Sequence, residues 1–323
     1  MIGRTSAYVA YFVVVLLSVA CENSFTPKGP YIEKMIVYAI LDSQSDTQYV
    51  RLYTTYNPLG FDPTANTVDH VVRDADVIIS QSASETYFRD TVVVRLDKTR
   101  YRDDIGAFVA YPFAIQKGRS YDLIIVSGNH GRVTATASVP DKGRLQVVNR
   151  TVLKGGGDKD EELAVLVWIR YATQGYVVRC YLDAEILEGG VRSLKRIEMP
   201  SQVIVKDNTT RTYNYPGLQR RTTAPESVSK EKQELVYFSR LAYDLMTYDV
   251  NARYSSQGIR INGAWFVLTQ VEQNMYTYYK IANAFQDGHS IRTDLPNWTN
   301  INGGYGVFGA MTQDSLYVDF SIF

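Results

Sequence analysis

The residue types that most often catalyse reactions or bind metals are scarce and scattered in this sequence. Its 323 residues include only 2 Cys and 3 His, and His70, His130 and His289 lie far apart. Neither the H-E-x-x-H pattern of zinc peptidases nor the G-x-S-x-G pattern of serine hydrolases occurs. Asp69 precedes His70, but adjacency in sequence does not make a catalytic triad. We therefore expect isolated surface histidines, no catalytic residue and no metal site.

Two further patterns could bind a cofactor or an ion. Gly304–Gly309 matches G-x-G-x-x-G, but a dinucleotide site needs a preceding strand and a following helix within a βαβ unit. The chain after it reads instead as a short closing strand, so we predict a tight glycine loop. Residues 155–162 place acidic residues after three glycines, but without the spacing of a calcium loop. We expect a solvated hairpin loop there, and we predict no cofactor.

The two cysteines have different predicted roles. Cys180 lies in the strand-like run 176–182 with no histidine or cluster of cations near it, which predicts a buried, unreactive thiol. Cys21 follows a leader in which Arg4 precedes the uncharged stretch Ala7–Val19. That stretch would span about 20 Å as a helix, which is too short for a bilayer core of ~30 Å and typical of an export signal.

The end of the leader indicates a lipid anchor. Leu17–Cys21 resembles the lipobox of bacterial lipoproteins, although Ser18 stands where leucine is commonest. The resemblance implies that residues 1–20 are a signal peptide cleaved before Cys21, and that Cys21 is acylated. Several acyl chains would hold the protein on a membrane, with residues 21–31 as a flexible tether. The alternative is an ordinary signal peptide followed by an incidental cysteine.

Composition and charge narrow the class of protein. Hydrophobic residues make up 45% of the chain and charged residues 21%, which is typical of a globular protein. The formal net charge is zero, which argues against a nucleic-acid-binding protein. Tyrosine is unusually frequent at 25 residues. This residue type is favoured on half-buried sheets and at hydrated binding surfaces.

The chain reads as mostly β, in two domains. Residues 32–140 predict an immunoglobulin-like β-sandwich, because short runs with two-residue alternation are separated by turn residues. Pro140–Gly143 marks a boundary, and residues 145–323 predict a second β-rich domain with one or two helices. The predicted strands of the first domain are Met35–Leu41, Tyr49–Thr55, Ala75–Ser80, Thr86–Leu96, Phe108–Phe113, Tyr121–Val126 and Val133–Val139.

The second domain is predicted from weaker patterns. We expect Leu163–Tyr171 and Tyr176–Ile186 to pair through a turn at residues 173–175, and a polar loop over residues 219–235. The spacing of aromatic residues predicts a helix over Glu272–Gln286 that packs on a sheet. The other predicted strands are Val203–Lys206 and Thr210–Tyr215, which form a hairpin, Trp265–Leu268 and Leu316–Phe320.

One segment is the candidate surface for a protein partner. Between residues 237 and 254 several aromatic side chains stand among polar residues, which is the composition of many protein interfaces. The candidate partner-binding residues are Tyr237, Phe238, Tyr243, Tyr248 and Tyr254.

The glycine-rich C-terminal end carries a resemblance to a known family. Asn300–Gly309, which follows Tyr276–Lys280 on the predicted helix, resembles the signature of the family called domain of unknown function 4249. The lipid cysteine, Met35–Leu41 and Val139–Pro140 also stand where that family has its landmarks. The resemblance implies an outer-membrane lipoprotein of the Bacteroidota, often found beside TonB-dependent receptors. It provides no catalytic residues to carry over.

Three functions remain open at this stage. The resemblance and the leader favour a non-enzymatic accessory or binding subunit of a TonB-dependent receptor or similar barrel, anchored by lipid at the outer membrane and on the cell surface. A structural or adhesive envelope lipoprotein would share these features. A surface hydrolase would require several acidic or histidine groups that converge in one pocket.

Overall fold

The computed structural model describes residues 30–57, 66–99, 101–149, 161–170, 172–188, 191–206, 210–221, 231–254, 259–283 and 298–320. The chain divides into two compact units, Met1–Glu33 and Lys34–Phe323. The predicted signal peptide, Cys21 as the predicted lipid-bearing residue and all but the end of the predicted tether lie outside the described residues. Among the described residues, no helix combines the length and the hydropathy that a membrane span requires.

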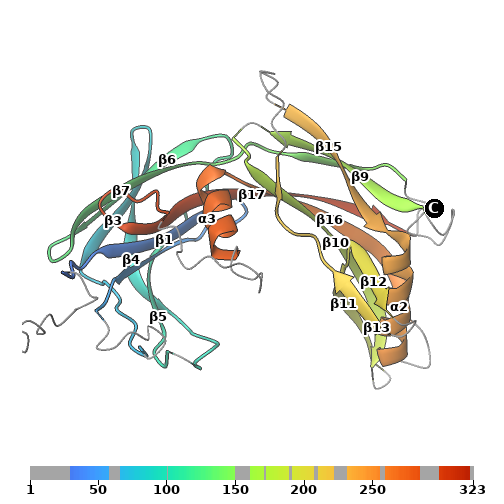
Figure 1. Ribbon diagram of the computed structural model, residues 1–323. Helices are drawn as coiled ribbons and strands as arrows, with labels where there is room; N and C mark the ends of the chain where they lie inside the picture. The colour runs from blue at the N-terminus through green and yellow to red at the C-terminus, as the bar shows by residue number, and fades with distance from the viewer. Residues whose placement is uncertain are drawn as a thin grey trace, which may run out of the picture. The chain divides into compact units, whose positions relative to one another are not determined.

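The first part of the chain forms a two-layered β-sandwich, as the sequence predicts (Figure 1). One layer contains β1 (Met35–Asp42), β2 (Gln48–Thr54) and β5 (Ile105–Ala110). The other contains β3 (Ala75–Gln81), β6 (Ser120–Ser127) and β7 (Gly131–Ser138). The side chains of β1, β2, β6 and β7 alternate between buried and more exposed positions, because only one face of each layer packs on the core.

One strand belongs to both layers. β4 (Ser84–Val93) pairs with β3 through its first half, up to Phe88, and with β5 from Arg89 onward. This change of partner folds a continuous strand order into two facing layers. The core between them is aliphatic and aromatic, and its fully buried members include Val37, Leu52, Ile79, Tyr121 and Ile125.

The second part has its own hydrophobic core. A sheet of β11 (Val191–Met199), β10 (Gly175–Glu188) and β16 (Arg260–Val271) accompanies a three-stranded sheet of β15 (Glu231–Ser239), β9 (Glu162–Arg170) and β8 (Arg144–Val147). The predicted hairpin is confirmed as β12 (Gln202–Lys206) and β13 (Thr210–Asn214). A short strand, β14 (Gln219–Arg220), pairs with β10.

Two predictions for this part are corrected by the structure, and one helix was not predicted. β9 and β10 do not pair with each other: β9 lies between β15 and β8, and β10 lies between β11 and β16. The sequence predicted a polar loop over residues 219–235, but residues 219–220 belong to strand β14 and residues 231–235 to strand β15. Residues 222–230 lie outside the described residues. The helix α2 (Arg240–Tyr254) was not predicted, because its apolar residues do not form a clear stripe at helical spacing. The predicted C-terminal helix is present as α3 (Gln273–Asn283).

The last strand connects the two parts. β17 (Tyr305–Asp319) pairs in parallel with β1 over residues 305–311, and then antiparallel with β16 over residues 311–319. Ile301, Phe308 and Ala310 consequently pack in the first core, whereas Val318 packs in the second. The sequence had assigned all of residues 145–323 to the second domain and did not reveal this exchange.

The glycine motif lies in this strand rather than in the predicted tight loop. Gly303 and Gly304 form the turn before β17, but Gly306 and Gly309 are strand residues. Gly306 has a φ of +105°, and a Cβ atom there would lie 2.0 Å from the carbonyl oxygen of Val37. The glycine therefore permits close pairing between β17 and β1.

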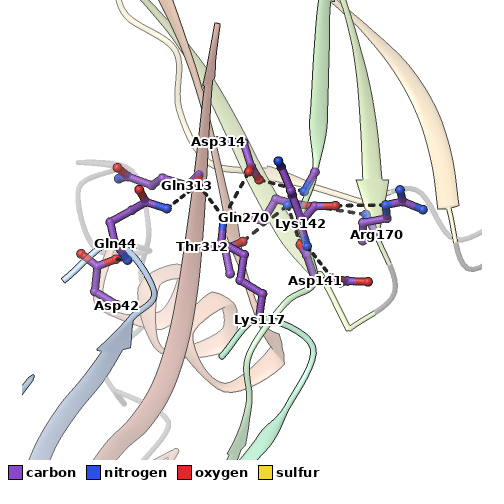
Figure 2. Close-up of polar contacts among 11 residues, drawn as sticks. Asp42, Gln44, Lys117, Asp141, Lys142, Arg170, Gln270, Thr312, Gln313 and Asp314 are labelled. Carbon is purple, nitrogen blue, oxygen red and sulfur yellow. Dashed lines mark hydrogen bonds and ion pairs between the residues drawn. The ribbon is translucent and has the colours of Figure 1, made fainter. Parts of the chain in front are cut away.

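A buried glutamine holds the region where β17 changes partners (Figure 2). Gln270 is fully buried on β16, and its Oε1 accepts hydrogen bonds from the backbone N–H of Arg170 and the hydroxyl of Thr173, both at 3.1 Å. Its Nε2 donates to the carbonyl of Asp141 at 3.1 Å and to the hydroxyl of Thr312 at 3.5 Å. One carboxamide thus joins the segment between the two parts to β9, β16 and β17.

Charged groups complete this junction. The carboxylate of Asp314 on β17 accepts from the backbone N–H of Gly143 at 2.8 Å and from Nζ of Lys117 at 3.1 Å. The Asp314 side chain is only 9% exposed, so both charges of this ion pair are partly desolvated. The backbone carbonyl of Gln313 accepts from Lys117 and from Gln44 (Figure 2).

Candidate functional site

The candidate site is an aromatic cavity of about 480 Å³ on the sheet face of β1 and β2 that points away from the core. Five aromatic side chains line it: Tyr38, Tyr53, Tyr56, His70 and Tyr101. The remaining lining residues are mainly small polar residues and two aliphatic ones. Its size is in the range of about 300–1,000 Å³ that is usual for small-molecule pockets.

Strand register places the first two rings. The buried residues that fill the core are the odd-numbered ones in β1 and the even-numbered ones in β2. Tyr38, Arg51 and Tyr53 therefore point to the opposite face of the sheet. Tyr38 lies opposite Arg51 in the antiparallel pair, and Tyr53 is its diagonal neighbour. The rings of Tyr38 and Tyr53 meet edge to face with centroids 6.3 Å apart. The rings of Tyr38 and of Tyr278 on α3 also meet edge to face, with their centroids 6.1 Å apart.

Residues 70–72 position the histidine. The N–H of Thr54 donates to the carbonyl of His70 at 2.9 Å. Val71 forms an isolated antiparallel β-bridge with Tyr53. This segment therefore lies antiparallel beside the end of β2, through this isolated bridge. The His70 ring stacks on the ring of Tyr56, with centroids 5.2 Å apart and planes inclined by 7°.

A partly buried ion pair supports the remaining wall. Arg95 pairs with the carboxylate of Asp69, and both side chains are 13% exposed. Nε of Arg95 also donates to the carbonyl of Asp103 at 2.7 Å, and its guanidinium lies 5.2 Å from the ring centroid of Tyr101. These bonds hold Tyr101 and Asp69 at the cavity.

The surroundings keep the tyrosine hydroxyls protonated. Burial, followed by the neighbouring Tyr278, raises the pKa of Tyr38 to about 12. Burial also raises the pKa of Tyr53, against the opposing effect of the Arg51 guanidinium, whose Nε donates to the Tyr53 hydroxyl at 2.8 Å. At neutral pH these hydroxyls remain uncharged groups that can exchange hydrogen bonds with a ligand.

The structure separates the five residues of the predicted partner-binding face. Tyr237 on β15 is 49% exposed and Tyr248 on α2 is 64% exposed. Tyr254 is half-buried, with Nζ of Lys195 4.5 Å from its ring centroid. Phe238 is fully buried in the second core, because it alternates with Tyr237 on the strand. Tyr243 packs against the same core, and burial raises its pKa to about 12.

The prediction that all five residues form one surface is therefore wrong for Phe238. A folded protein cannot present the Phe238 side chain to a partner, whereas Tyr243 is partly buried and keeps some exposed surface. Tyr237, Tyr243, Tyr248 and Tyr254 stay candidates for contact with a partner.

The chemistry-bearing residues of the sequence are placed as follows. Cys180 is fully buried, as predicted, and burial raises the pKa of its thiol far above the ordinary value. His289 lies outside the described residues, and His130 follows β6. His70 and Asp69 lie together in the cavity, but Asp69 pairs with Arg95 and not with the imidazole. In the described parts of the chain, no three His, Cys, Asp or Glu side chains gather as a metal ion would require.

Sequence reasoning missed the tyrosines of the cavity. The excess of tyrosine was visible, but Tyr38, Tyr53, Tyr56 and Tyr101 belong to segments that meet only in the folded chain. The available signal was the alternation of β1 and β2, which places Tyr38 and Tyr53 on the face away from the core.

The model of the family described as Domain of unknown function (DUF4249) matches residues 22–316. No curated protein matches the chain. Among solved structures, it is similar to the C-terminal globular domain of oligosaccharyltransferase from Pyrococcus abyssi, with 7% sequence identity and a TM-score of 0.22. That match covers 74% of this chain and 48% of the other, so it spans about half of that protein's chain and supports no inference about function.

Proposed function

The chain belongs to the family described as Domain of unknown function (DUF4249), and from this premise we propose that it is a lipid-anchored outer-membrane lipoprotein. In this proposal it acts at the cell surface as a non-enzymatic accessory or binding subunit of a TonB-dependent receptor or a similar barrel complex. The leader that ends at Cys21 supports the anchor. The aromatic cavity is the single observation that supports a binding role.

The cavity supports binding because of where its rings lie. Tyr38 and Tyr53 are on the outer face of a sheet whose inner face already carries the core, so they do not fill the interior of the sandwich. Arg51 and Arg95 hold two of the tyrosines in place through their side chains. A ligand would therefore meet a surface that is largely ordered before binding, which lowers the entropic cost of association.

The lipid anchor is tested by fractionation and mass spectrometry. The N-terminal peptide of the membrane-bound protein should begin at Cys21 and carry hydrocarbon mass. Replacement of Cys21 by Ser should release the chain from the membrane fraction, whereas replacement of the buried Cys180 by Ser should leave it there. An unmodified thiol at Cys21 in the wild-type protein would contradict the anchor.

The accessory role is tested by native purification in a mild detergent. The tagged protein should co-purify with an outer-membrane barrel protein, and the double substitution Tyr237→Ala and Tyr248→Ala should weaken this association if these exposed tyrosines contact the barrel. Tyr87→Ala is the matched control, because Tyr87 is 64% exposed on the other part of the chain. Recovery of the lipoprotein alone would contradict the accessory role and favour a structural or adhesive one.

A further inference from the structure

We propose that the aromatic cavity binds a pyranose ring of a neutral oligosaccharide. This inference rests on the binding role proposed above and specifies the chemical class of the ligand. Three properties of the cavity support it: its charges are already compensated, its walls are aromatic rings, and polar groups stand among these rings.

The charges at the cavity favour a neutral ligand. The carboxylate of Asp69 and the guanidinium of Arg95 compensate each other, and both are largely buried. Arg51, whose side chain adjoins the cavity, binds the hydroxyl of Tyr53. An anionic or cationic ligand would lose its hydration without gaining an unpaired counter-ion, which costs free energy.

The walls favour a ligand with polarised C–H groups. Four tyrosines and one histidine supply the rings, and the face of a phenol ring carries partial negative charge. The C–H groups of a sugar ring carry partial positive charge, because each carbon bears an oxygen. A pyranose can therefore place its C–H face on a tyrosine ring.

The polar groups favour the same ligand over a hydrocarbon. Thr55, Asn66, Asp69 and His70 also line the cavity. The amide of Asn66 already binds the backbone of Val68, and the hydroxyl of Thr55 accepts from the N–H of Lys34, so Asp69 and the tyrosine hydroxyls are the main polar groups for a ligand. A carboxylate that pairs with one guanidinium can accept further hydrogen bonds, and a tyrosine hydroxyl both donates and accepts. A hydrocarbon would desolvate these groups without replacing their hydrogen bonds, whereas sugar hydroxyls would replace them.

The inference is tested by calorimetric titration of the full-length lipoprotein, solubilised in a detergent without a sugar headgroup. The probes are maltohexaose, cellohexaose, mannohexaose and xylohexaose. At least one should bind with a Kd of about 1 mM or lower. Tyr56→Ala and Tyr101→Ala should each weaken that binding about tenfold, while Tyr56→Phe, which keeps the ring, should stay within about threefold.

Controls separate binding from folding. Tyr87→Ala removes an exposed tyrosine outside the cavity and should leave the affinity unchanged, and each variant should keep the wild-type thermal midpoint. Absence of binding by all four oligosaccharides would overturn the inference, as would equal affinity of the wild type and Tyr56→Ala. Binding of p-cresol in their place would assign the cavity to aromatic ligands and would also overturn it.

The titration needs neither a membrane nor a barrel partner. If a barrel co-purifies but no oligosaccharide binds, the ligand class is wrong and the accessory role stands. If an oligosaccharide binds but no barrel is recovered, the ligand class stands and the accessory role fails.

Discussion

At the residue scale, the glycine motif near the C-terminal end has a structural explanation. Gly306 faces Val37 across the parallel pair of β17 and β1, with a positive φ and no space for a Cβ atom. Asn300 supports the same strand, because its Nδ2 donates to the carbonyl of Phe308 at 2.7 Å and its Oδ1 accepts from the N–H of Phe308 at 3.0 Å. Gly306 therefore allows the last strand to pair with β1, and Asn300 binds this strand from the segment that precedes it.

Replacement of Gly306 should therefore be costly. Gly306→Ala should lower the free energy of unfolding by about 3 kcal/mol or more, since it combines backbone strain with a clash against a neighbouring strand. Urea unfolding followed by tryptophan fluorescence measures this. Gly217→Ala is the control, because a Cβ atom at that exposed glycine would meet nothing within 4 Å. Equal stability of both variants would show that β17 does not pair with β1 in this register.

The buried Gln270 makes a second prediction at this scale. Gln270→Met keeps the approximate volume but leaves the N–H of Arg170 and the carbonyl of Asp141 without this partner. We expect a loss of about 3 kcal/mol in the free energy of unfolding, because buried polar groups that lose their hydrogen bonds are costly. Gln273→Met, at an exposed position on α3, should change it by no more than about 0.5 kcal/mol. A Gln270 variant as stable as the wild type would contradict the role of this residue.

At the element scale, α3 depends on a buried carboxylate at its start. Oε2 of Glu272 accepts from the N–H of Asn274 at 2.6 Å, and Oε1 accepts from the N–H of Met275 at 2.7 Å. The N–H of Glu272 donates to the carbonyl of Ala310, which fixes the helix on β17. Gly309 allows this approach, since a Cβ atom there would lie 3.0 Å from that of Met275.

The burial of Glu272 predicts a pH dependence. Desolvation raises the pKa of this carboxyl above its ordinary value, although the backbone N–H groups of Asn274 and Met275 oppose the shift. Because the pKa is higher in the folded state, the protonated carboxyl stabilises the fold, and this contribution is fully present below the unfolded pKa of about 4.3. It is lost as the pH rises through the folded pKa. The free energy of unfolding of the wild type, minus that of Glu272→Gln, should therefore fall as the pH rises above this range.

Denaturant titrations of both proteins between pH 4 and pH 8 test this dependence. Glu162→Gln removes an exposed carboxylate from β9 and serves as the control. A difference that rises with pH would mean that the two N–H groups outweigh desolvation, and would reverse the assignment.

At the scale of the whole molecule, the shared strand β17 makes the two cores interdependent. Its first half supplies Phe308 and Ala310 to one core, and its second half pairs with β16 beside the other. The contacts of Asp314 and Gln270 lie where these halves meet (Figure 2). The first sandwich therefore lacks one of its strands when the chain ends near residue 140.

A fragment of residues 30–143 should accordingly show no cooperative unfolding transition. The same fragment joined to residues 298–311 through a flexible Gly/Ser linker should regain one, because the added segment restores the partner of β1 and the side chain of Phe308. Thermal unfolding followed by circular dichroism compares the two. Cooperative unfolding of the shorter fragment, with the same midpoint as the longer one, would show that the first sandwich is complete without β17.

Local patterns explain which parts of the fold were predictable. The strands of the first sandwich and the helix α3 follow from alternation and from the spacing of aromatic residues, because the burial of one face acts on neighbouring residues. The buried state of Cys180 follows from its apolar strand. The helix α2 was missed because its apolar residues form no clear stripe, and the start of β15 was missed because Glu231–Glu234 are charged or polar. Tertiary packing overrides local preference in both segments.

The sequence by itself determined the β-rich class, the positions of most strands and the leader with its candidate lipid cysteine. Only the tertiary structure decided the sharing of β17, the burial of Phe238 and the assembly of the aromatic cavity. Tyr38, Tyr53, Tyr56, His70 and Tyr101 come from different strands and connections. Contacts between such segments depend on strand order and register, which are set by the packing of the whole chain and leave no local periodic signal.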